Sequence, residues 1–185
     1  MQDAKSVQIS LGAHLKLSHE QSPQTEEEKL KMADVPYASA LGSLMYLMLC
    51  SRPDLAFTVS LVSKFMSNPG RSHWVALKWI MRYLKGIRSV GIVFKKNQSY
   101  NNYVEGFAYA DYARDMEKRK STFGFVFTLW GNTVSWKSKL QHMVILSSIE
   151  SEYVALIEAV NEATWLKDLA NKLGIKQQTM MINIQ

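Results

Sequence analysis

The first half of the chain carries apolar residues at helical spacing. This pattern predicts three helices, over residues 37–50, 55–66 and 72–84. Pro53 cannot continue the first helix, but it suits the opening turn of the second. In the third helix Trp74, Leu77 and Met81 share one stripe, and Gly86 suits the C-terminal cap. These helices have enough apolar surface to form a small core together.

The residues before the first helix lack this periodicity. Residues 1–35 are polar and include Ser22-Pro23 and the acidic run 26–28. Such composition is typical of loops and of segments that bury little apolar surface. We therefore expect residues 1–35 to be an irregular surface segment, a polar linker.

After about residue 90 the period changes to that of strands. Alternation predicts short strands over residues 90–94, 103–109, 123–129, 133–136, 142–146 and 180–184, with a hairpin turn at Gly131-Asn132. A long helix is predicted over residues 149–173, with an apolar face made by Ile149, Tyr153, Leu156, Val160 and Ala163. This helix can cross over and place the last strand parallel to the first. The fold class is therefore α/β, with a mixed sheet (α+β).

The charge of the chain is uneven. The 185 residues carry a formal net charge of +6. Residues 1–35 hold four basic and six acidic side chains, so residues 36–185 hold 18 basic and 10 acidic ones. A basic body favours an anionic partner, and nucleic acid is the commonest of these.

The composition also excludes several classes of protein. The single cysteine, Cys50, rules out an internal disulfide framework, and one Cys with four scattered His cannot form a zinc site. The N-terminus has no apolar signal segment, and the longest apolar stretch, about 38–50, is too short to span a bilayer. We expect a soluble intracellular protein of the cytoplasm or nucleus, without a membrane partner.

Several ordered motifs resemble one family. They are Pro36-Tyr37-Ala38-Ser39-Ala40-Leu41-Gly42, Arg52-Pro53-Asp54, Asn68-Pro69-Gly70, His73-Trp74, Arg82-Tyr83-Leu84-Lys85-Gly86, Arg119-Lys120-Ser121-Thr122, Ser135-Trp136-Lys137-Ser138-Lys139, and Leu146-Ser147-Ser148 with Glu150, Glu152 and Tyr153. From about residue 8 onward, the chain resembles the Pol polyprotein of copia-type LTR retrotransposons, just after the reverse transcriptase. The resemblance implies a helical connection over residues 36–88 and a truncated ribonuclease H-like domain over residues 89–185.

The same resemblance implies a chemistry and partners. The family hydrolyses the RNA strand of RNA–DNA hybrids during reverse transcription, with two Mg²⁺ ions held by four carboxylates. The expected partners are such a hybrid or another nucleic acid, and the reverse transcriptase portion of the same polyprotein.

The carboxylates of this chain depart from the family pattern. Tyr109 stands where the first metal-binding Asp is expected, and a phenol is a poor Mg²⁺ ligand at neutral pH. The resemblance places the second ligand at Glu152. Helical spacing alone does not distinguish it from Glu150, because both lie about 80° from the predicted apolar face, although Ser147 and Glu150 resemble a capping box.

The remaining ligands are weaker candidates. The third falls at or beside Gln185, and the fourth falls beyond it. Asp111 and Asp115 are either weak metal ligands or solvated acids of a turn. We therefore predict Glu152 and Asp111 as the catalytic and metal-binding residues of a copy that has lost its activity.

Basic residues supply candidate phosphate contacts, which give affinity without base specificity. They are Lys118, Arg119, Lys120, Lys137, Lys139, Arg82 and Lys85. The alternative is that they solvate loop ends and a helix face. Three hypotheses remain open at this point: a degenerate ribonuclease H fragment, a non-catalytic nucleic-acid-binding or protein-interaction module, and the product of a decayed reading frame.

Overall fold

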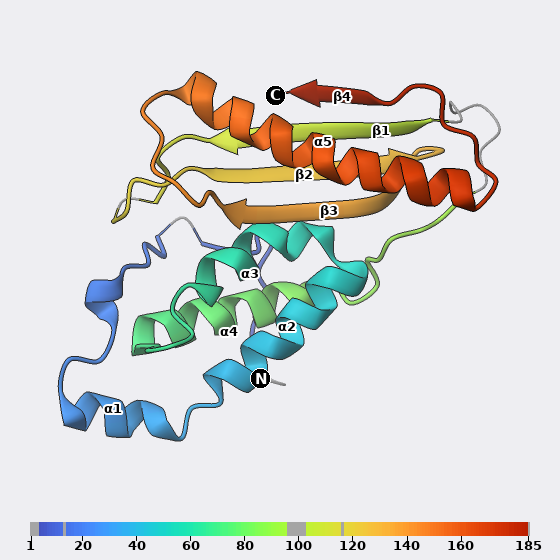
Figure 1. Cartoon of the computed structure of the whole chain (residues 1–185). Coiled ribbons are helices and arrows are strands. Elements are labelled where there is room, and N and C mark those ends of the chain that lie inside the picture. Colours follow the sequence, from blue (N-terminus) through green and yellow to red (C-terminus); the bar gives the residue numbers. More distant parts are fainter. Residues whose placement is uncertain (1–3, 13, 96–102, 116, 185) are drawn as a thin grey trace. The chain divides into compact units, whose positions relative to one another are not determined.

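The computed structural model describes residues 4–12, 14–95, 103–115 and 117–184 (Figure 1). The chain divides into two compact units, Met1–Gly91 and Ile92–Gln185. The first unit is helical, and the second contains a four-stranded mixed sheet with one long helix. The α/β class predicted from the sequence is confirmed.

The first unit is built from α2 (Tyr37–Ser51), α3 (Ala56–Ser63) and α4 (Arg71–Gly86). A short 3-10 turn, η2 (Pro53–Leu55), precedes α3, with Pro53 in its first turn as expected. The three predicted helices are confirmed, although α3 ends three residues before the predicted end at Met66. Their shared core contains Tyr37, Leu41, Leu44, Leu55, Val59, Val62, Ala76, Leu77 and Ile80.

Two polar contacts tie these helices together. The Tyr37 hydroxyl donates a 2.8 Å hydrogen bond to the carbonyl of Val62, and burial raises the pKa of Tyr37 to about 12. Between α2 and α3, Arg52 donates two hydrogen bonds of 2.8 and 2.6 Å to Asp54, which also accepts one from Tyr83 of α4. Burial of the Asp54 carboxyl is outweighed by these hydrogen bonds, so its pKa lies below the ordinary value of 3.8.

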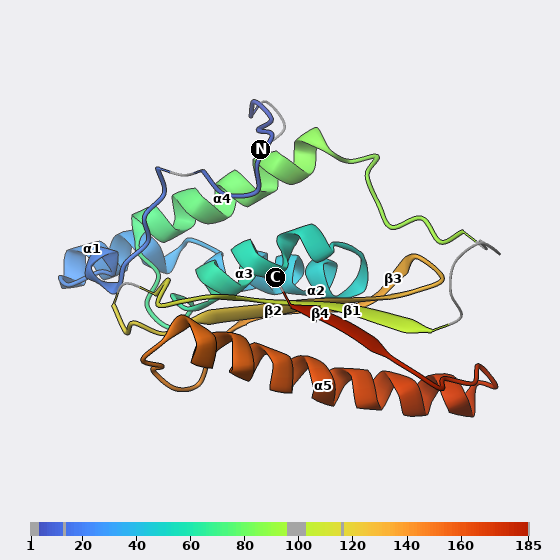
Figure 2. The same ribbon diagram turned by 90° about the horizontal axis from the view of Figure 1, so that it is seen from above.

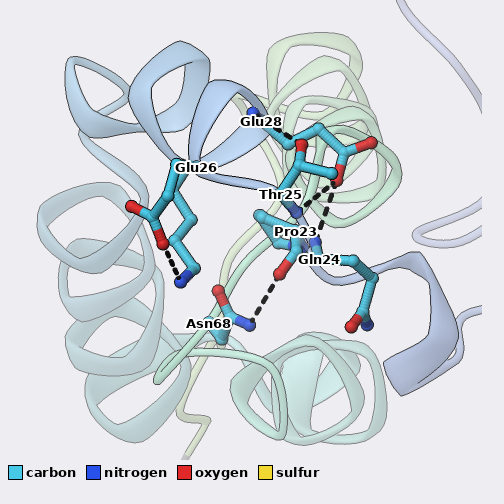
Figure 3. A network of polar contacts seen from close by, with 7 residues as sticks. Pro23, Gln24, Thr25, Glu26, Glu28 and Asn68 are labelled. Atoms are coloured by element: carbon cyan, nitrogen blue, oxygen red, sulfur yellow. Dashed lines mark hydrogen bonds and ion pairs between the residues drawn. The ribbon is translucent and has the colours of Figure 1, made fainter.

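The expectation of an irregular surface segment is wrong for part of residues 1–35. Residues Glu26–Ala33 form α1, whose N-terminus is closed by a capping box between Thr25 and Glu28 (Figure 3). Thr25 Oγ1 accepts from the Glu28 amide at 3.3 Å, and the Glu28 carboxylate accepts from the amides of Gln24 and Thr25. These amide hydrogen bonds lower the pKa of Glu28. From the sequence, the acidic run was assigned to an irregular polar linker, whereas carboxylates in a first turn stabilise a helix.

Other parts of the same segment pack on the helices. Leu11, Leu15 and Leu17 lie against the helical core. His73, at the start of α4, is fully buried; its Nδ1 accepts from the Gly70 amide and its Nε2 donates to the Ser18 carbonyl. Asn68 donates a 3.4 Å hydrogen bond to the carbonyl of Pro23 (Figure 3). The segment before α2 is thus attached to the helical unit through its own backbone.

The second unit has the strand order β3-β2-β1-β4. Its strands are β1 (Val104–Asp111), β2 (Thr122–Leu129), β3 (Asn132–Leu140) and β4 (Met181–Ile184). The first three form an antiparallel meander, and β4 pairs parallel with β1, as predicted from the long helical crossover. That helix, α5 (Ser148–Lys172), lies along one face of the sheet (Figure 2).

The hairpin turn lies one residue earlier than predicted. Its two residues are Trp130 and Gly131, with φ of 53° and 73°, and Asn132 already begins β3. Two left-handed residues are the geometry of the tight turn whose twist matches that of the strands. The Asn132 side chain donates to the Trp130 carbonyl at 3.2 Å, so it caps the turn from the strand.

Two predicted strands are absent. Residues 90–95 are described and form no strand, and Val90, Val93 and Phe94 are exposed there. Residues 142–146 form a loop, in which the carbonyls of His142 and Leu146 accept from Lys120 and Tyr112 rather than from a neighbouring strand. Alternation in such short segments was therefore insufficient to identify strands.

The apolar face predicted for the long helix is confirmed at Ala163 and wrong at Ile149, Tyr153 and Val160. The buried residues of α5 are Ser151, Ala155, Ala159, Ala163, Leu166 and Ala170. Four of them, Ala155, Ala159, Ala163 and Leu166, share a core with Phe123, Phe125 and Phe127 of β2. Ile149, Tyr153 and Val160, which we expected inside, are 75%, 65% and 45% exposed. Three phenylalanines already fill much of the space above the sheet, so alanine occupies most of the positions of α5 that face the strands. No helix in the described part of the chain is both long and apolar enough to cross a membrane.

Candidate metal and nucleic-acid site

Tyr109 lies on β1, on the sheet face opposite α5. Its neighbour Ala108 belongs to the core beneath α5, and successive strand residues point to opposite faces. Tyr109 pairs with Gly124 of β2. A Cβ added at Gly124 would stand 2.3 Å from the Tyr109 ring, so the ring covers the backbone of this glycine. The tyrosine fills a space that only a glycine leaves open.

Asp111 is the last residue of β1, and its side chain contacts the turn that follows the strand. Its carboxylate forms an ion pair with Arg114, three residues further on. By strand parity it lies on the same sheet face as Tyr109. Asp115 follows in the turn, where its carboxylate accepts from the Glu117 amide at 3.3 Å. Both carboxylates make contacts within the turn. This agrees with the alternative that Asp111 and Asp115 are acids of a turn and not metal ligands.

The helix position distinguishes Glu150 from Glu152, which the sequence could not do. Glu150 lies nine residues before the buried Ala159, about 180° around the helix at 100° per residue, whereas Glu152 lies seven residues before it, about 20° away. Glu150 accepts from the Leu146 amide at 3.1 Å, and its own amide donates to Ser147 Oγ at 3.2 Å. Glu150 therefore caps the helix. Glu152 is exposed at the end of the face that α5 turns toward the sheet.

These carboxylates do not form a ligand cluster. Among the described residues, no group of three or more His, Cys, Asp or Glu side chains is placed to hold one metal ion. Tyr109 presents a phenol, and Asp111 is engaged with Arg114. Mg²⁺ requires several hard oxygen ligands around each ion. The donor set present here therefore does not fit the two Mg²⁺ ions that the sequence resemblance implies.

Three of the predicted phosphate contacts lie in the connection between β1 and β2. Lys118 and Arg119 are exposed, and the Lys120 ammonium donates to the carbonyl of His142. The connection folds back tightly, with φ of 50° at both Ala113 and Arg119 and a 3.1 Å hydrogen bond from the Asp115 amide to the Lys120 carbonyl. Lys118 and Arg119 thus project from a compact, basic turn.

Lys137 and Lys139 lie on β3, on the face that carries α5. Lys137 pairs with Glu158 of α5 at 3.3 Å, and its ammonium lies 5.6 Å from the centre of the Phe123 ring. Two residues earlier, Ser135 donates a 2.6 Å hydrogen bond to Glu162 of α5. Lys139 is exposed. Lys137 therefore connects strand and helix, while Lys139 presents its charge to solvent.

Arg82 and Lys85 belong to the first unit, on α4. The Arg82 guanidinium donates to the carbonyl of Lys5 at 2.7 Å, and the Lys85 ammonium donates to that of Ala4 at 2.9 Å. Both side chains thus contact the segment that precedes α1. A groove that these two cations share with Lys118–Lys120, Lys137 and Lys139 stays a prediction.

Gln141 is a positioning residue that the sequence analysis did not identify. It is buried directly after β3, where its amide donates to the Ser121 carbonyl at 2.8 Å and its side chain donates to the Ser151 carbonyl at 2.9 Å. It therefore joins the start of β2 to the first turn of α5, which carries Glu152. The residue types around Gln141, with Lys139 before Leu140 and His142 after it, gave no sign of this role.

Comparison with known proteins adds a second line of information. Over 182 residues, 98% of its length, the chain is 46% identical to the retrovirus-related Pol polyprotein from transposon TNT 1-94 of Nicotiana tabacum. It is 37% identical over 140 residues, 76% of its length, to that from transposon RE2 of Arabidopsis thaliana. The chain spans 14% and 9% of these two polyproteins.

A shorter relative is covered almost completely. The chain is 48% identical over 135 residues, 73% of its length, to secreted RxLR effector protein 161 of Plasmopara viticola, and this match covers 94% of that protein. No protein-family model and no solved structure matches the chain. On the strength of these identities, and of the motifs that run from Pro36 to Tyr153, the chain belongs to the retrovirus-related Pol polyproteins of copia-type transposons.

Proposed function

We propose that this segment of a Pol polyprotein contains a ribonuclease H-like unit that binds RNA–DNA hybrid or other nucleic acid and does not cleave it. The meander β1-β2-β3, the crossover helix α5 and the parallel strand β4 support the ribonuclease H-like assignment, together with the motif resemblance. The helical unit corresponds, in this proposal, to the connection that follows the reverse transcriptase. The reverse transcriptase portion of the polyprotein is its expected partner.

The binding half of the proposal is supported by exposed cations of the second unit. Lys118, Arg119 and Lys139 present their charges to solvent from the β1–β2 turn and from β3. Lys120 and Lys137 already hold a carbonyl and a carboxylate of the protein. Exposed side chains that contact phosphates release counterions, which makes the affinity dependent on salt.

The non-catalytic half is carried by one observation: the Tyr109 ring lies over Gly124 at the position where the family resemblance expects a metal-binding Asp. A phenol stays protonated at neutral pH and offers little to a hard divalent cation. Glu152 is exposed at the end of the face that α5 turns toward the sheet, and the described residues provide no carboxylate cluster around it. One aligned glutamate is insufficient for two-metal hydrolysis.

The test measures binding and cleavage of the same labelled RNA–DNA hybrid by the purified chain. We expect binding whose log K falls with log salt at a slope of about −2 to −3, which corresponds to roughly three phosphate contacts. Replacing Lys118 and Arg119 by Gln should make this slope shallower by about 2. Lys172→Gln, at the far end of α5, is the control for loss of charge alone.

Cleavage is measured with Mg²⁺ and with Mn²⁺ in separate reactions. We expect no product from the wild type. Tyr109→Asp alone should also give none, because the other ligands are missing. Hydrolysis by the wild type or by Tyr109→Asp would overturn the non-catalytic half, while absence of salt-dependent binding would overturn the other.

A further inference from the structure

A row of exposed residues runs along the outer side of α5. Tyr153, Ile157 and Val160 are 65%, 48% and 45% exposed, and Thr164 is exposed one turn further on. Their intervals of four, three and four residues are those of the contact positions in a two-stranded coiled coil. At about 100° per residue they lie roughly 100–160° around the helix from the buried Ala159, away from the sheet. We call Tyr153, Ile157, Val160 and Thr164 the seam.

Thr164 does not make the seam polar. Its hydroxyl donates a 2.8 Å hydrogen bond to the Val160 carbonyl of its own helix, so its polar group is satisfied and its methyl group is left for packing. The Tyr153 hydroxyl stands at the tip of a long side chain and can stay in water while the ring is covered. Contiguous exposed apolar groups of this kind mark interaction surfaces.

Opposite charges stand at the two ends of the seam. Glu150 precedes Tyr153 by three residues and Lys167 follows Thr164 by three, so both continue the same spacing. Glu150 accepts from the Leu146 amide through Oε2, and a carboxylate has acceptor capacity on both oxygens. The helix cap therefore leaves Glu150 able to pair with a cation. The seam begins next to a negative charge and ends next to a positive one.

This order of charges indicates what would cover the seam. If a second copy of α5 packs antiparallel, about a two-fold axis between residues 158 and 159, each layer joins two different residues. The pairs are Ile157 with Val160, Tyr153 with Thr164, and Glu150 with Lys167. The apolar pairs then lie at the centre, and an ion pair closes each end. Parallel packing would instead set Glu150 against Glu150 and Lys167 against Lys167, which is repulsive.

We propose that α5 is the contact surface of a homodimer, in which the seams of two copies pack antiparallel. The positions that flank the centre of the seam carry no charge, with Val154 and Asn161 on one side and Leu156 on the other. Glu158 and Glu162 of the same helix contact β3 instead. One pair of helices is a small interface, so we expect a dimer that forms and dissociates with concentration. The inference concerns the second unit alone and does not depend on nucleic-acid binding.

The first test is sedimentation velocity of the full chain over about a hundredfold range of concentration. We expect the wild type to pass from monomer to dimer as the concentration rises. Lys167→Glu turns both terminal ion pairs into repulsive ones and should raise the dissociation constant of the dimer about tenfold. Lys172→Glu is the matched control, because it makes the same change of charge five residues later on α5, outside the seam spacing. It should leave the dissociation constant unchanged.

The second test determines the direction of packing by cross-linking. Cys50, the single cysteine, is replaced by Ser, and one new cysteine is introduced in each of two chains by Tyr153→Cys and Thr164→Cys. Antiparallel seams bring these two positions together, so a disulfide should form in the presence of glutathione disulfide only when the two chains are mixed. Between identical chains the two equivalent positions lie about 16 Å apart along the seam, beyond the roughly 7 Å between Cα atoms that a disulfide spans.

Three results would refute the homodimer. A chain that stays monomeric at the highest concentration and gives no cross-link has no such contact surface. Equal effects of Lys167→Glu and Lys172→Glu would place the contact away from the seam. Cross-links between identical chains, and none between the two mixed chains, would mean parallel packing. Neither test contains nucleic acid, so failure of the homodimer leaves the proposed function standing.

Discussion

The packing of Tyr109 on Gly124 predicts a strong energetic coupling between these two residues. A Cβ at Gly124 would stand 2.3, 2.5 and 2.6 Å from Cε1, Cζ and the hydroxyl oxygen of Tyr109. Ordinary carbon contacts are about 3.5–4.0 Å, so Gly124→Ala must move the ring by more than about 1 Å. Overpacking of this kind costs about 1–3 kcal/mol, and the gain of Ala over Gly in a strand offsets about 0.5–1 kcal/mol.

Removal of the ring should reverse the sign of this effect. In a Tyr109→Ala background the clash is absent, so Gly124→Ala should stabilise the second unit by about 0.5–1 kcal/mol. The coupling energy of the double-mutant cycle is then about 1–3 kcal/mol. Gly106→Ala is the control, because its Cβ would stand 2.3 Å from Phe127 on the other face of the sheet, where Tyr109 has no influence.

Native-state hydrogen exchange of the β1 and β2 amides is the appropriate assay, since it reports on the second unit without the helical one. The expected result is a cost at Gly106 that is equal in both backgrounds and a cost at Gly124 that vanishes when the ring is absent. An equal cost of Gly124→Ala in both backgrounds would refute the placement of the ring. The observation that supports the non-catalytic half of the proposed function would then be lost.

Three further predictions concern α5, its first turn and the helical unit. Ala159→Leu should destabilise the second unit by about 1–3 kcal/mol in hydrogen exchange, because Ala159 is fully buried, whereas the neighbouring Val160→Leu should change it by less than about 0.5 kcal/mol. Gln141→Leu should cost about 1–3 kcal/mol, because it removes the buried side-chain hydrogen bond to the Ser151 carbonyl and leaves only the main-chain one to Ser121; equal stability of the variant and wild type in urea unfolding would contradict this. The pKa of Asp54 is lowered in the folded state, so its carboxylate stabilises the fold above pH 3.8 and loses this effect as the pH falls through the lower folded pKa. Asp54→Asn should therefore be less stable than wild type at about pH 7. In thermal unfolding, this difference in stability should shrink below pH 3.8.

The sequence was sufficient to predict the order of the main helices and strands, but not which face of α5 is buried. Helices α2 and α4 and the crossover α5 were predicted within a few residues, because their periodicity extends over three turns or more. The inner face of α5 was not, since Ile149 and Tyr153 are more hydrophobic than the alanines that actually meet the sheet. Hydrophobicity ranks residues by their transfer from water, whereas the space left by Phe123 and Phe125 selected for size.

The candidate site could likewise be predicted only in part from the sequence. The substitution at Tyr109 could be recognised from the motif alone, but the distinction between Glu150 and Glu152 required the true inner face of α5. The roles of Arg82 and Lys85 could not be foreseen, because their partners are main-chain groups some 80 residues earlier, at separations of 77 and 81 residues. Contacts to a distant backbone leave no pattern in the residue types that form them.

The row of alanines on the inner face of α5 also limits how the sequences of transposon copies can diverge. Ala155, Ala159 and Ala163 lie directly against the phenylalanines of β2, so drift at these three positions is restricted to residues of similar volume if the unit is to fold. The outer side of the same helix has no such restriction, and the large side chains found there today can be exchanged without disturbing the sheet. Among diverging copies, the plain-looking alanines should therefore change last.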